Sequence, residues 1–282
     1  MKEVTKIIHV LILILASTGL SLGQDKISPT TISTFFKEIK ANTDSYKDLW
    51  NIDLYGPILL VNPETRIVCS NFPDSTGILT QDGEIYSGIL PNNINIANTA
   101  INWGGLSWAM IMLPLPENKH ERLDLLSHEL FHRSQPVLGF KMNNTANNHL
   151  DQKEGRVYLR LEIEALRQAL VAKSISEVNR HLTDALYFRN HRYSVYQNAK
   201  ANENSLELNE GLATYTGIFM SGRDNKQMED YFENKIIEFQ NYPTFVRSFA
   251  YLTIPLYGII LSKSDKYWNR QTDSNTNLTD FF

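Results

Sequence analysis

His128-Glu129-Leu130-Phe131-His132 is the most informative stretch of this chain, because it has the form H-E-x-x-H. On a helix, residues four positions apart lie on the same face, one turn above the other. Two imidazoles at this spacing can bind one zinc ion, and Glu129 lies beside them, where it can act as a general base on water. The stretch therefore predicts a Zn²⁺ site on a helix, with His128 and His132 as ligands.

The residues around this motif favour a helix over residues 119–135. Leu123, Leu126 and Leu130 recur at helical spacing and form an apolar side, and Pro136 and Gly139 end the pattern. The alternative interpretation is an amphipathic helix that carries two histidines without binding a metal.

The composition of the chain is that of an ordinary globular protein. It has 282 residues, 42% of them hydrophobic and 21% charged, and a net charge of −4. This length suits one large domain or two small ones, with a substantial hydrophobic core. A protein that binds nucleic acid needs a basic face, so we expect no nucleic-acid partner.

The first 23 residues have the layout of a secretory signal peptide. Lys2 and Lys6 precede a nearly apolar run over residues 7–16, and small and polar residues follow up to Gly23. The alternative is a membrane anchor, but a run of this length falls short of the roughly 20 residues that span a bilayer. We therefore expect a secreted or periplasmic protein with no stable membrane insertion after signal removal. Its only cysteine, Cys69, cannot form an internal disulfide, so the core alone must stabilise the fold.

The order of the predicted elements indicates an α+β fold, with a small N-terminal β-sheet followed by a mostly helical region. We divide the chain into the signal peptide (residues 1–23), a strand-rich part (24–116), a helical part (117–263) and a polar tail (264–282) that we expect to be partly disordered. The strand-rich part begins with a helix over residues 32–50. Strands are predicted over residues 57–61 and 66–69 as a hairpin, then over 85–90, 99–103 and 107–113. Helices are predicted over residues 119–135, 151–173, 176–201, 205–220, 227–240 and 245–262.

A catalytic zinc site usually has three protein ligands and one open position. One class of enzymes takes the third ligand from the last histidine of H-E-x-x-H-x-x-G-x-x-H. In this chain Gln135 stands at the glycine position and Leu138 at the position of that histidine. This class is excluded, and the remaining common choice is a glutamate from a later helix.

Two glutamates are candidates for the third ligand. Glu210 lies in a mostly apolar segment, where a carboxylate is costly unless it is paired or bound to metal. Glu162 lies in the apolar stripe of the helix predicted over residues 151–173, where it could instead pair with an arginine such as Arg160 or Arg167. We prefer Glu210 and keep Glu162 as the rival.

The combination of these motifs resembles the gluzincin metallopeptidases. His128-Glu129-x-x-His132 followed by Asn209-Glu210-Gly211-Leu212-Ala213 is most similar to the gluzincin aminopeptidase pattern, H-E-x-x-H and then N-E-G-[FL]-A. The resemblance implies that Glu210 is the third zinc ligand. It also implies an edge strand for substrate before the zinc helix, for which residues 107–112 are the candidate. The alternative for these residues is an ordinary sheet strand packed against that helix.

This chain departs from the family pattern in two places. Residues 133–209, 77 in number, separate the second histidine from Glu210, and this gap is long enough for two inserted helices. The candidate edge strand also lacks the acidic residue that would hold the amino terminus of a substrate. The resemblance therefore predicts zinc-dependent hydrolysis, most simply of a peptide or protein, and leaves open whether the cleavage is endo- or exopeptidic.

The predicted reaction is attack of a zinc-activated water on a carbonyl, with Glu129 as the general base. A donor to the oxyanion is also needed, and Tyr215, Tyr251, Tyr257 and His191 are the candidates. The basic run over residues 189–192 could bind a substrate carboxylate, but it is more simply a solvated helix face. The alternative to an enzyme is a secreted binding or structural module, whose metal would be absent or closed in by a fourth ligand such as His149 or Glu162.

Overall fold

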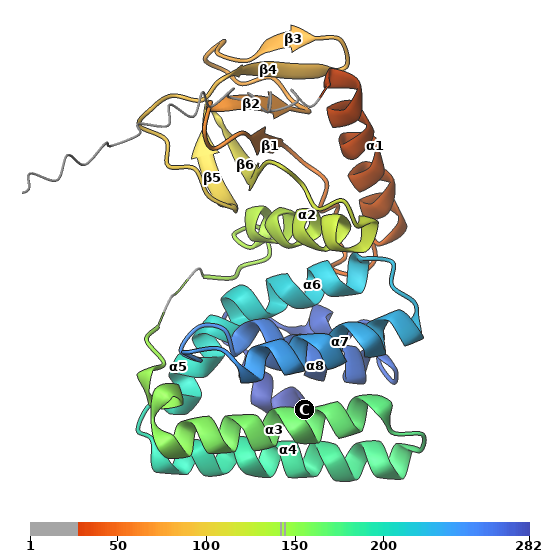
Figure 1. The fold of residues 1–282 in the computed structure, drawn as a ribbon, viewed down its shortest axis with the longest axis vertical. Coiled ribbons are helices and arrows are strands. Elements are labelled where there is room, and N and C mark those ends of the chain that lie inside the picture. Colours follow the sequence, from red (N-terminus) through yellow and green to blue (C-terminus); the bar gives the residue numbers. More distant parts are fainter. Residues whose placement is uncertain (1–27, 142, 144) are drawn as a thin grey trace, which may run out of the picture.

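The computed structural model describes residues 28–141, 143 and 145–282, so the predicted signal peptide lies outside the described residues. The chain forms a mixed β-sheet with two helices on one face, followed by a helical bundle (Figure 1). This is the α+β fold that the order of the elements predicts. No helix within the described ranges is long and apolar enough to cross a membrane.

The chain enters the fold through helix α1 (Pro29–Ser45), which Ser28 caps by accepting a hydrogen bond from the Thr31 amide. A six-stranded sheet follows in the order β3-β4-β2-β1-β6-β5. Its neighbouring strands are antiparallel except for the parallel pair β1–β6. The strands are β1 (Ile58–Val61), β2 (Ile67–Ser70), β3 (Thr80–Asp82), β4 (Ile85–Ile89), β5 (Thr99–Trp103) and β6 (Leu106–Met112).

Alternate side chains of the central strands face opposite sides of the sheet. Ile58 and Leu60 of β1 pack against α1 and against helix α2 (Lys119–Ser134), together with Leu126 and Leu130 of α2. On the other face, Leu59 packs in a second cluster with Trp108 and other buried residues of the sheet and its loops. The helix predicted over residues 119–135 is thus confirmed as α2, and it lies between the sheet and the bundle (Figure 1).

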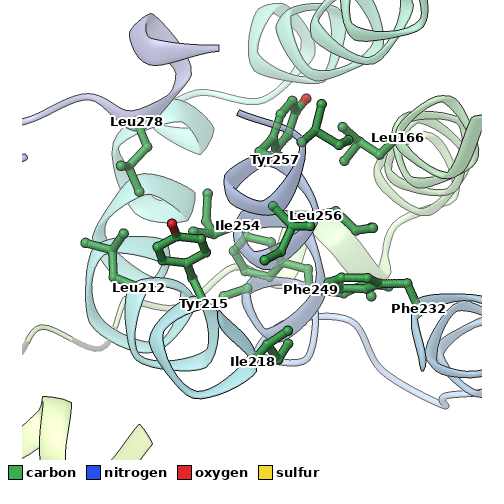
Figure 2. Close-up of a cluster of buried hydrophobic side chains, with 14 of the residues drawn as sticks. Leu166, Leu212, Tyr215, Ile218, Phe232, Phe249, Ile254, Leu256, Tyr257 and Leu278 are labelled. Carbon is green, nitrogen blue, oxygen red and sulfur yellow. The ribbon is translucent and has the colours of Figure 1, made fainter. Parts of the chain in front are cut away.

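The helical bundle contains the largest hydrophobic core of the molecule. Tyr215, Leu212 and Ile218 pack against Phe249 and Ile254 of the neighbouring helix at its centre (Figure 2). The bundle consists of α3 (Lys153–Val171), α4 (Ile175–Val195), α5 (Ala199–Leu206), α6 (Leu212–Met220), α7 (Asn225–Gln240) and α8 (Ala250–Ser262). A π-helical turn, η2 (Glu207–Gly211), joins α5 to α6.

The structure corrects three expectations about the elements. The helix predicted over residues 176–201 is two helices, because the chain turns between α4 and α5 with Asn198 in the left-handed conformation at φ 62°. Strand β3 was not predicted, because its three residues are all exposed and show no apolar alternation. The polar tail is packed against the bundle, since Trp268 is 2% exposed and Leu278 is fully buried.

Candidate metal centre

Helix α2 holds His128 and His132 on the side that faces away from the sheet core. Asn118 begins the helix by accepting hydrogen bonds from the amides of His120 and Glu121, at 2.8 and 3.2 Å. Leu126 and Leu130 face the sheet cluster, so His128 and His132 are directed into a cavity between α2 and the bundle.

The third residue of the cluster, Glu210, comes from the π-helical turn η2. π-Helical turns are rare and are frequently found at functional sites. A Cβ on Gly211 would come within 2.7 Å of Ile254 on α8, so only glycine allows this close approach of the turn to α8. Gly217, two turns later, has the same effect at α2, because a Cβ there would meet a side-chain oxygen of Asp124 at 2.4 Å. Gly211 thus allows η2 to pack closely on α8, and Gly217 allows α6 to pack closely on α2.

The three predicted ligands meet at one point. The Nε2 atoms of His128 and His132 are 2.9 Å apart, and the Oε2 of Glu210 is 3.8 and 3.3 Å from them. Zinc holds nitrogen and oxygen ligands at about 2.0–2.2 Å in a tetrahedron, which places the ligand atoms roughly 3.3–3.5 Å from one another. The observed separations scatter around this value, so these residues fit one zinc ion. Among the described residues, no other group of three or more histidine, cysteine, aspartate or glutamate side chains is placed to hold a metal ion.

The charge states of His128 and Glu210 suit a cation. Burial, and then the charge of His132, lowers the pKa of His128 to about 3, so its imidazole is neutral at pH 7. Burial opposes ionisation of Glu210, but its hydrogen bond with His132 and the charge of that imidazole lower its pKa to about 2. Burial also disfavours the cationic form of His132, yet its contacts with Glu210 and Glu129 raise its pKa. The site thus presents a neutral imidazole and a permanent carboxylate.

Glu129 lies in the same cavity with an unsatisfied oxygen. Its side chain is buried, and its Oε2 has no hydrogen-bond partner among the described residues. Burial raises the pKa of Glu129 to about 7. The charge of Glu210 adds to this rise, and the charge of His132 opposes it. A buried carboxylate oxygen without a partner is costly, and such groups cluster at functional sites. Glu129 is therefore placed to exchange a proton with a molecule in the cavity.

Gln135 links the two elements that carry the ligands, and the sequence analysis missed this role. Its Oε1 is 2.8 Å from the Nδ1 of His132, and its Nε2 donates to the carbonyl of Asn209 at 2.9 Å. Because a backbone carbonyl only accepts, the amide orientation is set, and the Nδ1 of His132 must donate. In the neutral imidazole, the lone pair then lies on Nε2, where it can bind a metal. The available signal was a polar residue three positions after His132, at the end of the zinc helix.

We expect Gln135→Ala to weaken zinc binding by about 10–100-fold, the usual cost of removing a group that orients a metal-bound histidine. The substitution removes both the partner of His132 and the link to η2. Competition with a chromogenic chelator measures the affinity. An unchanged affinity would show that Gln135 does not orient His132.

The cavity around the cluster has a volume of about 730 Å³. On the sheet side it is lined by Asn98 and Thr99, at the start of β5. The predicted edge strand over residues 107–112 is wrong, because β6 pairs with β1 on one side and β5 on the other. The edge strands of the sheet are β3 and β5, and it is β5 that borders the cavity.

The rival ligand, Glu162, is elsewhere. Its two oxygens are 2.6 Å from Arg189 and 2.8 Å from Arg192, and all three side chains are fully buried. Glu162 is thus paired with arginines, though not with Arg160 or Arg167. The interpretation of residues 189–192 as a solvated face is also wrong for Arg189 and Arg192.

These buried charges support the turn that carries the third ligand. Both guanidinium NH₂ groups of Arg189 donate to the carboxylate of Glu207, at 3.0 and 2.7 Å. Arg192 pairs with Glu203 at 2.6 Å, and His149 also contacts Glu203, at 2.7 Å. We call Glu162, Arg189, Arg192, Glu203 and Glu207 the buried charge network. Since Glu207 is the first residue of η2, the network anchors the turn that presents Glu210.

The four candidates for an oxyanion donor differ in whether they lie at the cavity. Tyr215 and Tyr257 are buried in the bundle core, and His191 packs on Tyr158 with ring centroids 4.1 Å apart. Tyr251 lines the cavity, and its ring is stacked on that of His128, 6.2 Å away and inclined by 8°. Of the four, Tyr251 is therefore the one beside the cluster.

The chain has no match among protein-family models, curated proteins or solved structures.

Proposed function

We propose that this protein is a zinc-dependent hydrolase of peptide bonds. One zinc ion would be held by His128, His132 and Glu210, with Glu129 as the general base. The observation that carries the proposal is the convergence of three ligand atoms beside the unpaired carboxylate oxygen of Glu129, in an open cavity. The resemblance of the two motifs to gluzincin metallopeptidases supports the same assignment.

Zinc bound at this site supplies Lewis-acid chemistry, which polarises a substrate carbonyl and promotes ionisation of water. Glu129 accepts the proton of the attacking water and returns it to the leaving amine. Tyr251 lines the same cavity, and its hydroxyl, which is hydrogen-bonded to Glu210, can donate to the oxygen on which negative charge develops. Gln135 holds His132 in the tautomer that leaves Nε2 free.

The position of β5 favours an extended substrate. An edge strand has unpaired backbone donors and acceptors, and a peptide can add to it as a further strand. The start of β5 borders the cavity that contains His128 and Glu129, so a peptide paired with β5 would pass the cluster. A peptide or protein substrate is therefore the best fit to the site.

The alternative function is a secreted binding or structural module with a closed metal site. Such a site needs a fourth protein ligand. His149 contacts Glu203, and Glu162 is held by two arginines, so both suggested fourth ligands are engaged elsewhere. This arrangement favours an open coordination position and hence the enzyme. Export rests on the signal-peptide pattern alone and is proposed on that basis.

The direct test is hydrolysis of a broad peptide library by the zinc-loaded protein. We expect cleavage that a chelator abolishes and that zinc restores, with one zinc ion bound per chain. A zinc-loaded protein that cleaves none of the library would contradict the proposal.

A further inference from the structure

A side pocket opens from the main cavity beyond the metal cluster. Its volume is about 470 Å³, and it lies between α7 and α8. It shares five lining residues with the main cavity, so the two spaces are continuous: Thr214, Tyr231, Lys235, Arg247 and Tyr251.

The lining of the side pocket carries positive charge. Lys235 and Arg247 both line it, and none of its described lining residues is acidic. The hydroxyl of Tyr242, another lining residue, already donates to Glu238 at 3.0 Å. The acidic side chains Glu121 and Asp124 line the main cavity and not the side pocket. Lys235 and Arg247 also line the main cavity, so the positive charge lies where the two spaces meet, and Glu121 and Asp124 lie on the side of the main cavity.

Arg247 lies between the metal cluster and the side pocket. Its Nη2 is 3.3 Å from the Oε1 of Glu210, so it contacts the carboxylate oxygen that is farther from the imidazoles. The Arg247 side chain is 51% exposed, which leaves donors of its planar guanidinium for a second anion. A group bound there would lie one or two residues from a peptide bond at the cluster.

Lys235 can supply a second cation at low cost. Its side chain is 45% exposed, and its ion pair with Glu238, at 3.0 Å, lies at the surface. Such exposed pairs contribute little, so Lys235 can exchange this partner for a substrate carboxylate.

We propose that the side pocket binds a carboxylate of the substrate through Arg247 and Lys235. The carboxylate belongs either to a free C-terminus or to an acidic side chain close to the scissile bond, and both offer the same acceptor atoms. The inference rests on the proposed function, because it assigns the substrate portion that lies beyond the cluster.

The test compares peptides that differ only in this charge. The first pair is acetyl-Ala-Ala-Phe-Ala with a free or an amidated C-terminus, and the second is acetyl-Ala-Ala-Phe-Glu-amide against its Gln counterpart. Binding is measured by calorimetry on the zinc-loaded Glu129→Gln protein, and kcat/KM is measured on the parent. We expect at least one carboxylate peptide to bind roughly tenfold more tightly than its neutral partner. The pair that shows the advantage identifies the source of the carboxylate.

Substitutions assign the effect to the side pocket. Lys235→Gln and Arg247→Gln are each expected to reduce the advantage, and together to abolish it, while neutral peptides bind as before. The matched control is Lys226→Gln, an exposed lysine of α7 that pairs with Asp230 outside both cavities. If Arg247 acted only on the reacting carbonyl, Arg247→Gln would lower kcat equally for charged and neutral peptides, which would overturn its assignment to the carboxylate.

The two proposals fail in different ways. Equal binding of charged and neutral peptides, or an advantage that survives both substitutions, overturns the side-pocket assignment even when the parent cleaves peptides. A carboxylate preference in binding that the substitutions remove, without hydrolysis by the parent, upholds the side pocket and contradicts the proposed function.

Discussion

The Glu129→Gln protein is expected to bind one zinc ion and to hydrolyse peptides about 10²–10⁴-fold more slowly than the parent. Glutamine has nearly the shape of glutamate but cannot accept the proton of the attacking water. Glu129 is not one of the three clustered ligands, so its replacement leaves the metal site intact. The prediction separates proton transfer from metal binding.

Two measurements on the same samples check this expectation: kcat/KM on a cleaved peptide and metal content by mass spectrometry. The matched control is Glu117→Gln, which removes an exposed carboxylate just before α2 and outside the cavity. It should keep the activity of the parent. If Glu129→Gln kept full activity with zinc bound, Glu129 would not be the general base.

The second large effect concerns the buried charge network. We expect Arg189→Met to lower the free energy of unfolding by about 3–5 kcal/mol, because it leaves buried carboxylates without their partner. Arg189 contacts both Glu162 and Glu207, and all three side chains are inaccessible to solvent. Methionine replaces the length of the side chain but not its charge or its hydrogen bonds.

Urea unfolding measures this loss, with Arg167→Met as the matched control. Arg167 also contacts two glutamates, Glu164 and Glu233, but these pairs are partly exposed. Its replacement should cost at most about 1 kcal/mol. Equal losses in the two variants would show that burial does not decide the energetic role of the network.

Much of the fold follows from local patterns in the sequence. The hairpin of β1 and β2, the positions of β5 and β6 and the bounds of α2 are confirmed close to their predictions. Each depends on residues close together in the chain: turn residues, apolar alternation or helical spacing. The identity of the edge strand could not be predicted this way, because it depends on the parallel pairing of β1 with β6, some 50 residues later in the chain.

The residues of the candidate site also differ in whether local sequence or distant contacts determine their role. The spacing of His128, Glu129 and His132 is local, so their common face follows from the sequence. The choice between Glu210 and Glu162 depends on distant residues. Glu162 forms ion pairs with Arg189 and Arg192, which come from the following helix. Gln135 was missed because its role depends on a carbonyl of η2, 74 residues away.

The most direct test of the zinc site is anomalous scattering from zinc-loaded crystals, measured above and below the zinc absorption edge. We predict one peak about 2.0–2.2 Å from the Nε2 atoms of His128 and His132 and from the carboxylate of Glu210. A peak elsewhere, a peak at the two histidines that Glu210 does not approach, or no peak would contradict the site on which the proposed function depends.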